Sequence, residues 1–167
     1  MNIEILKKYA PGYENLDEVE RISVHHFSLL WTIFEAQVLD TNASANKISS
    51  KVKEWNDQGL LNERWFDDVL EYFRNRYMDT QAEGFNDKFA SLHFRRHDNE
   101  ELVKAVLSKE KESIPDQLTA CMIIVLRFRN NFFHGLKWAY KMRDQQGNFE
   151  HSIKLMQECI DRFATAN

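Results

Sequence analysis

The chain is predicted to fold as an all-α protein, and two observations lead to this prediction. Apolar residues recur at intervals of three and four in several segments that are bounded by capping and helix-stopping residues. No segment shows the strict alternation of a β-strand, and no internal repeat is present. With 167 residues, of which 43% are hydrophobic, the chain can bury one sizeable core. We expect a single helical domain over 1–167, in which 1–14 form an N-terminal extension.

The N-terminal part predicts a short helix followed by a long one. The short helix covers 1–10 and ends at a Pro-Gly pair. Either Asn15 or Asp17 then caps a helix that runs to about Leu39, with acidic residues in its first turn where the helix dipole favours them. Its expected buried stripe consists of Ile22, Val24, Phe27, Leu30, Trp31, Phe34 and Val38.

Four shorter helices are expected in the middle of the chain. They cover 46–55, 62–78 with Asn62 as cap, 85–94 and 100–107. The helix over 62–78 carries several aromatic residues on one face. Such an aromatic stripe is more typical of a core than of a platform for stacked bases, so we assign it to packing.

The most apolar segment of the chain is the helix that follows. Ile114-Pro115 opens it, in agreement with the preference for proline in a first turn, and apolar residues then run almost without interruption over 118–133. The exceptions fall in the last two turns, where two arginines, a pair of asparagines and a histidine stand close together. Burying unpaired polar groups costs several kcal/mol, so their placement needs a reason.

A final amphipathic helix is expected over 149–163.

These polar residues belong to the string Arg129-Asn130-Asn131-Phe132-Phe133-His134, which reads R-N-x-x-x-H. The string resembles the signature of the HEPN superfamily, small all-α helical bundles. The resemblance implies a metal-independent ribonuclease that acts as a homodimer, with Arg129 and His134 as the catalytic pair. Asn130 would orient the phosphate or the histidine. Other HEPN proteins are inactive, so a non-catalytic module is the alternative.

The chemistry that the resemblance implies suits these side chains. RNA is cut without metal when its own 2′-hydroxyl attacks the neighbouring phosphorus, and histidine can serve as the base or acid. Arginine can grip two phosphate oxygens at once. Five helical positions turn by about 500°, so Arg129 and His134 point about 140° apart. They converge on one phosphate only if the helix unwinds near His134, which Gly135 permits, or if a second subunit contributes.

Further residues are expected to support the motif. Glu35, on the long N-terminal helix, could face Arg129 and fix its guanidinium; the alternative is that it points to water. The weaker candidates for substrate contact are Arg127, Asn131, Lys137 and Lys141. In a purely structural interpretation, His134 caps its helix and Arg129 bonds a buried carboxylate.

Charge and cysteine content limit the function classes. The net charge of −4 argues against a general nucleic-acid coat protein, yet no acidic residue occurs over 117–143, which suits phosphate contact at one site. A basic triplet over 95–97 is a second candidate for such contact, although a solvated helix end is the favoured explanation. Cys121 and Cys159 lack metal-ligand spacing and are expected to be reduced core thiols.

The first residues do not resemble a signal peptide, and no apolar run is long enough for a membrane span.

The HEPN resemblance implies an endoribonuclease that leaves a 2′,3′-cyclic phosphate, and the reduced cysteines and the lack of a signal peptide lead us to expect it in the cytoplasm. Its expected partners are RNA and a second copy of the chain in a homodimer, and an antitoxin protein is a further candidate partner, as in a toxin–antitoxin, antiphage or stress system. No cofactor, metal or membrane is expected to take part. The alternative is a non-catalytic dimeric HEPN module that binds a nucleotide, RNA or a partner protein.

Overall fold

A computed structural model describes residues 3–10, 12–79, 84–134 and 144–164 of the chain. The predicted all-α class is confirmed, and the described part contains no strand beyond one isolated bridge between Met78 and Phe85. The elements are α1 (Ile3–Tyr9), η1 (Tyr13–Asn15), α2 (Glu18–Gln37), α3 (Ala45–Asp57), α4 (Asp67–Tyr77), α5 (Asp87–Ala90), α6 (Glu100–Leu107), α7 (Ile114–Phe133) and α9 (Gln146–Phe163). None of the described helices is both long enough and apolar enough to cross a membrane.

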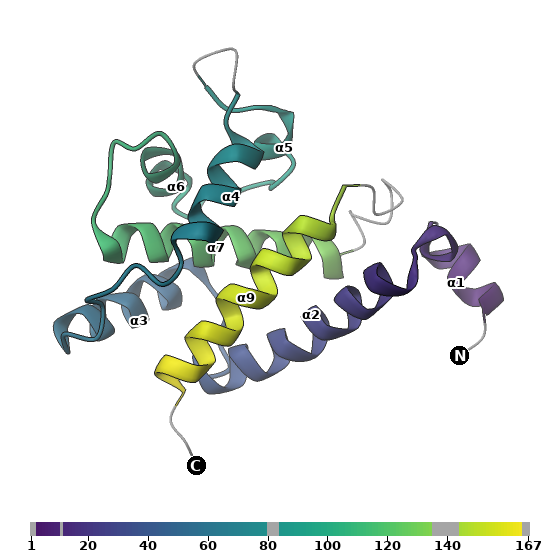
Figure 1. The fold of residues 1–167 in the computed structure, drawn as a ribbon, viewed down its shortest axis with the longest axis horizontal. Coiled ribbons are helices and arrows are strands. Elements are labelled where there is room, and N and C mark those ends of the chain that lie inside the picture. Colours follow the sequence, from purple (N-terminus) through teal and green to yellow (C-terminus); the bar gives the residue numbers. More distant parts are fainter. Residues whose placement is uncertain (1–2, 11, 80–83, 135–143, 165–167) are drawn as a thin grey trace.

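Helix α7 forms the centre of the fold. Its N-terminus is capped by the Ser113 side chain, which accepts from the Asp116 backbone N–H, and Pro115 lies in the first turn. Every residue over 117–128 is buried, as expected for a helix that is apolar on all sides. Helices α3 and α6 pack against it, α4 crosses it, and α9 packs along α2 and also contacts α7 (Figure 1).

Helix α2 begins where the sequence predicts and packs along α9. Of the two predicted caps, it is Asp17 that caps α2, in a capping box that Asp17 and Glu20 form with each other's backbone N–H groups. At mid-helix, the Phe27 ring meets the rings of Phe128, Phe132 and Phe149 edge to face, with centroids 5.3–5.9 Å apart. This cluster joins α2 to α7 and α9.

One member of the predicted α2 stripe does not belong to the core. Ile22 is 44% exposed, whereas Val24 and Phe27 on the same helix are buried. Helices α9 and α7 cover one side of α2, and the Ile22 side chain lies on the side that they leave uncovered.

Three predicted boundaries are wrong. Helix α4 begins at Asp67 instead of Asn62, because the preceding residues form a turn that buries Phe66 completely. Helix α5 ends at Ala90, because the carbonyls of residues 91–93 bond side chains of α7. Helix α9 begins at Gln146, three residues before the predicted start.

Both cysteines are free thiols in the core. Cys121 and Cys159 have no exposed surface, and burial in apolar surroundings raises the pKa of each thiol. The thiolate is the reactive form of cysteine. The two side chains therefore act as small apolar groups in this fold, as the sequence predicts.

Candidate functional site

The candidate site lies at the C-terminal end of α7, where it faces the C-terminal half of α2. Arg129 extends from α7 toward Glu35, and its Nη2 lies 3.5 Å from Glu35 Oε2. Both side chains are about one-quarter exposed, 29% for Arg129 and 26% for Glu35. Of the two expectations for Glu35, the structure therefore places it against the motif and not in open solvent.

Glu35 is held in place by three donors. Its Oε2 accepts from Trp31 Nε1 at 2.7 Å as well as from Arg129, and its Oε1 accepts from the Ala43 backbone N–H at 3.3 Å. Trp31 and Glu35 are four positions apart and therefore lie on the same side of α2. The carboxylate thus remains bonded even without Arg129, which makes it a fixed anchor for the guanidinium.

The Arg129 guanidinium also lies between two aromatic rings. Its central carbon is 5.0 Å from the ring centroid of Trp31 and 5.0 Å from that of Phe133. Cation–π contacts at this distance contribute about 0.5–2 kcal/mol. Arg129 Nη1 also donates to Asn130 Oδ1 at 3.0 Å. Arg129 is therefore held by charge, stacking and a hydrogen bond at a partly exposed position.

His134 is the exposed C-cap of the same helix. Its backbone N–H still donates to the Asn130 carbonyl at 3.0 Å, so α7 does not unwind before it. With the helix intact, the Arg129 and His134 side chains leave α7 about 140° apart. Within the described residues, the His134 imidazole forms no hydrogen bond or ion pair.

Unlike Arg129 and His134, Arg127 and Asn131 are buried in the interior. Arg127 is 2% exposed; its Nε donates to the Leu92 carbonyl at 3.1 Å, and its Nη1 lies 3.0 Å from Asp98 Oδ2. Asn131 Nδ2 also donates to the Leu92 carbonyl, at 2.9 Å. Burial lowers the pKa of the Arg127 guanidinium, while nearby Asp98 opposes this shift. Both side chains fasten the loop after α5 to α7, and this placement favours a structural role over the expected substrate contact.

The remaining sequence candidates are either exposed or outside the described residues. Lys137, Lys141 and Gly135 lie outside the described residues. Arg95 and Arg96 are exposed on the loop between α5 and α6. Within the described part of the chain, the structure therefore brings together Arg129, Asn130 and Glu35 directly, with His134 one turn further along α7.

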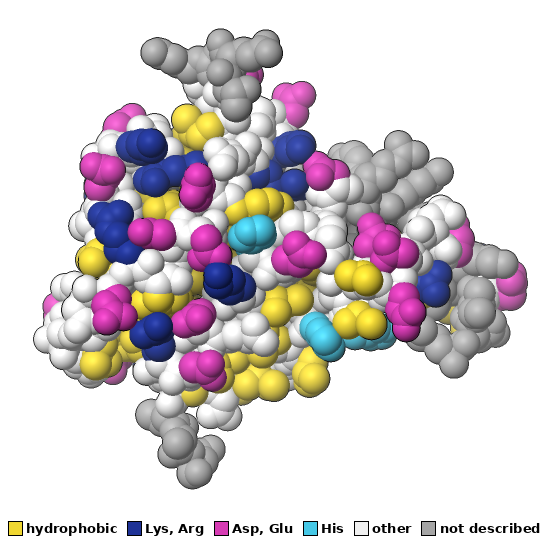
Figure 2. Space-filling model, viewed as in Figure 1, with side chains coloured by type: hydrophobic (Ala, Val, Ile, Leu, Met, Phe, Trp, Pro, Cys, Tyr) yellow, Lys and Arg dark blue, Asp and Glu magenta, His cyan; other side chains and the backbone are white. Residues whose placement is uncertain are grey.

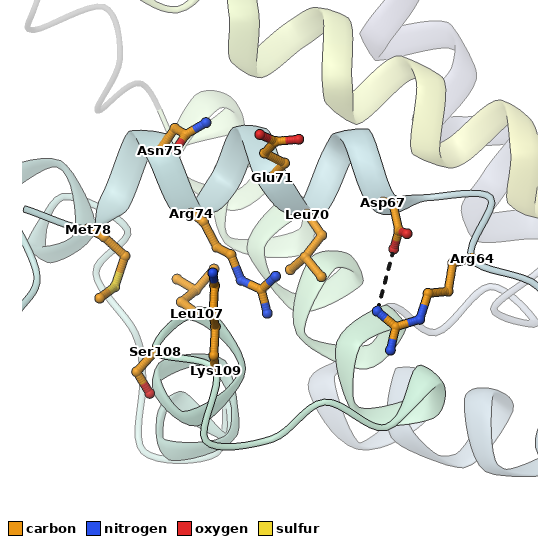
Figure 3. A pocket seen from close by; sticks show the side chains of 10 residues that line it. All are labelled: Arg64, Asp67, Leu70, Glu71, Arg74, Asn75, Met78, Leu107, Ser108 and Lys109. Atoms are coloured by element: carbon orange, nitrogen blue, oxygen red, sulfur yellow. Dashed lines mark ion pairs between the residues drawn. The ribbon is translucent and has the colours of Figure 1, made fainter. Parts of the chain in front are cut away.

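A separate pocket of about 490 Å³ opens between α4 and α6 (Figure 3). Arg74 reaches across it from α4 and donates to the Val106 carbonyl at 2.9 Å. Arg64 and Lys109 add two more cations, and Leu70, Met78 and Leu107 supply apolar lining. Asp67 and Glu71 also line the pocket, and Asp67 pairs with Arg64. No motif residue lines this pocket, so it is separate from the candidate site at the end of α7.

Two residues that matter at these sites are absent from the sequence-based candidates. Trp31 carries both a donor for Glu35 and a ring for Arg129, and its spacing of four from Glu35 is a signal that the sequence does contain. Asp98 neutralises Arg127 from a loop, and no periodic pattern marks it. No group of three or more His, Cys, Asp or Glu side chains is placed to hold a metal ion within the described ranges.

Comparisons with models of known protein families, with curated proteins and with solved structures gave no match.

Proposed function

We propose that the protein is a metal-independent endoribonuclease of HEPN type, acting at Arg129 and His134. The observation that carries the proposal is the arrangement at the end of α7. Arg129 is fixed by Glu35 and Trp31 yet is 29% exposed, and an exposed histidine follows it within the R-N-x-x-x-H string. A rigidly held cation suits the stabilisation of a phosphate, and an imidazole suits proton transfer to it. Because the two side chains leave α7 about 140° apart, one phosphate would meet Arg129 of one copy and His134 of a second.

Arg129 keeps donors for a phosphate in this arrangement. Each Nη atom carries two N–H groups, and one on Nη1 is used by Asn130 while one on Nη2 faces Glu35. The other N–H of each Nη remains available to phosphoryl oxygens, which arginine can bind two at a time. Glu35 would therefore position Arg129 and still leave guanidinium N–H donors free for a phosphate.

The reaction needs one group to take the proton of the 2′-hydroxyl and another to protonate the departing 5′-oxygen. The 2′-oxygen attacks phosphorus, the P–O5′ bond breaks, and the products are a 2′,3′-cyclic phosphate and a 5′-hydroxyl. His134 can fill one of these roles. A second copy of the motif in a homodimer would supply the other, as the HEPN resemblance implies, because one chain offers a single histidine there.

The absence of a metal requirement is directly testable. Cleavage of a short RNA should proceed at the same rate in excess EDTA and in Mg²⁺, and an RNA with a 2′-O-methyl group at the cut position should resist cleavage. Mass spectrometry should identify a 2′,3′-cyclic phosphate. His134→Ala protein, purified identically, controls for contaminating ribonucleases. Cleavage that EDTA abolishes and Mg²⁺ restores would exclude the proposed mechanism.

The pocket between α4 and α6 favours a second candidate function, a non-catalytic module that binds a nucleotide. Arg64, Arg74 and Lys109 outnumber the carboxylates of Asp67 and Glu71 in its lining, which suits a phosphate, and its apolar residues suit a base (Figure 3). In that case calorimetry should detect nucleotide binding, and Lys109→Glu should weaken it about tenfold or more, since a bond to a charged group is worth about 1.5–3 kcal/mol. Lys53→Glu, on exposed α3 surface, is the matched control. Binding that both variants weaken equally would rule this pocket out.

The biological role belongs to the same proposal. A ribonuclease of this size in a toxin–antitoxin, antiphage or stress system would cut cytoplasmic RNA, and an antitoxin protein would hold it inactive by covering the end of α7. Coexpression with the product of the neighbouring gene, followed by the cleavage assay, tests this arrangement.

A further inference from the structure

The loop between α5 and α6 carries two arginines and two histidines that the proposed reaction does not use. All four side chains are exposed: His93, Arg95, Arg96 and His97. The sequence favours a solvated helix end as the explanation for the triplet over 95–97, but α5 already ends at Ala90 and α6 begins only at Glu100. The triplet therefore lies within a loop, and its charge needs another explanation.

This loop is fastened to α7 from the inside. Arg127 Nε and Asn131 Nδ2 donate to the Leu92 carbonyl at 3.1 and 2.9 Å. Asp98 Oδ2 lies 3.0 Å from Arg127 Nη1 and also accepts from the Arg95 backbone N–H at 2.7 Å. The backbone of the loop is thus held at both ends by buried side chains of α7, while its basic side chains remain exposed.

The loop lies on the side of α7 from which His134 extends. Seven positions separate Arg127 from His134, a turn of about 700°, so the two side chains leave the helix within about 20° of each other and about 10 Å apart along its axis. Arg129 leaves α7 about 200° around from Arg127, toward Glu35 on α2. The basic loop therefore shares one side of α7 with the His134 imidazole, and Arg129 lies on another side.

Two stretches without a carboxylate meet on this side of α7. Neither Asp nor Glu occurs over 88–97 or over 117–134, although the whole chain has a net charge of −4. Asp98, which follows the loop, is paired with Arg127. Elsewhere the charges are mixed: Figure 2 shows Lys and Arg side chains interspersed with Asp and Glu over α4 and α9. The positive charge of the loop is therefore a local feature and not part of a general basic surface.

The two loop arginines are available to a ligand. Both are exposed, and neither guanidinium forms a hydrogen bond or ion pair within the described part of the chain. They border a hollow of about 400 Å³, which is lined by Phe94, Arg95, Arg96, Asn99, Glu100 and Glu101. Both glutamates are paired with Lys104, and Phe94 is half-buried. Cations beside an aromatic ring are the combination with which proteins bind single-stranded nucleic acid.

We infer that the loop over 93–97 binds phosphates of single-stranded RNA that flank the phosphate cut at His134. The inference deepens the proposed function and rests on it for the identity of the substrate. RNA is favoured over an acidic protein because the cations stand beside an aromatic ring and on the same side of α7 as His134. In the arrangement proposed above, the loop and the His134 that serve one phosphate belong to the same copy.

The first experiment measures binding without cleavage. A fluorescent RNA of about 12 nucleotides, within the usual site size for a single strand, keeps its phosphates when every ribose is 2′-O-methylated but cannot be cut. Arg95→Gln combined with Arg96→Gln should weaken its binding about tenfold or more, measured by fluorescence anisotropy. The slope of log K against log salt should also become less steep by about 1.4, since each phosphate contact of a single strand contributes about 0.7.

The matched control removes the same charge elsewhere. Lys53→Gln combined with Arg162→Gln changes exposed residues of α3 and α9, near the ends of these helices that Figure 1 shows opposite the C-terminal end of α7. This variant should bind the RNA like the wild type. Arg95→Lys combined with Arg96→Lys keeps both charges and should retain most of the salt dependence. Thermal midpoints establish that all three variants are folded.

Three outcomes of this experiment would overturn the inference. The first is equal binding by the loop variant and the control, and the second is a wild-type chain that does not bind the RNA. The third is displacement of the RNA from the wild type by a glutamate-rich peptide of the same charge, which would identify the loop as a site for an acidic protein.

The second experiment separates the loop from the cleavage step. A dinucleotide contains only the phosphate that is cut, whereas the longer RNA, here with its 2′-hydroxyls, also reaches the loop. The loop variant should lower the ratio of kcat/KM for the long RNA to that for the dinucleotide about tenfold or more, through a higher KM. An unchanged ratio would contradict the inference. If the wild type cuts neither substrate, the ribonuclease proposal fails, and the binding experiment still decides whether the loop holds RNA.

Discussion

Replacing His134 with alanine is expected to slow RNA cleavage by about 10²-fold or more, the usual contribution of a general acid or base. His134 is exposed, and its imidazole has no bonded partner within the described residues. The thermal midpoint should therefore fall by no more than a few degrees. Initial rates on a short labelled RNA and a thermal melt of the same preparation provide both measurements. His25→Ala, at an exposed histidine of α2 outside the motif, is the matched control.

Arg129→Lys belongs to the same experiment and should also lose most of the activity. Lysine keeps the charge near Glu35 but loses the two-pronged donor geometry and much of the stacking on Trp31 and Phe133. Stability should change modestly, because Glu35 retains its bonds from Trp31 Nε1 and the Ala43 N–H. A structural role for both residues predicts the opposite outcome: lower stability and unchanged cleavage. Full activity in folded His134→Ala protein would refute the ribonuclease proposal.

The order and type of the helices could be predicted because they depend on local patterns. Asp17 with Glu20 marks the start of α2, and the long apolar run identifies α7 as the central helix. The start of α4 could not be predicted, because it depends on the burial of Phe66 against distant parts of the chain. Local preferences lead to errors where a tertiary contact provides more free energy than the helix propensity of a few residues.

The candidate site could be predicted in part for a similar reason. The R-N-x-x-x-H string is contiguous, so its residues are found in the sequence, and Glu35 was a reasonable partner for Arg129. The burial of Arg127 could not be predicted from the sequence, which offered it only as a weaker candidate for substrate contact than Arg129. The two are only two positions apart on α7, about 200° around the helix. Which of them faces the interior depends on the loop that reaches α7 from α5, and that loop shows no periodic pattern.

The second prediction with a large expected effect concerns the contribution of Arg127 to stability. Arg127→Met is expected to lower the free energy of unfolding by about 3–5 kcal/mol, the usual cost of removing one partner of a buried ion pair. Methionine fills part of the volume but leaves Asp98, only 13% exposed, without its cation. It also leaves the His93 carbonyl without the donor Nη2, which lies 2.5 Å away. Urea unfolding followed by circular dichroism measures the change.

The matched control is Arg162→Met on α9. Arg162 is 39% exposed and pairs with Glu158 one turn away, so its loss should cost less than about 1 kcal/mol. Adding Asp98→Ala to Arg127→Met should recover part of the lost stability, since the unpaired carboxylate is then removed as well. If Arg127→Met were as stable as the control, Arg127 would not be buried against Asp98. Its guanidinium would then be available to RNA, and the substrate contact that the sequence predicts for it would regain support.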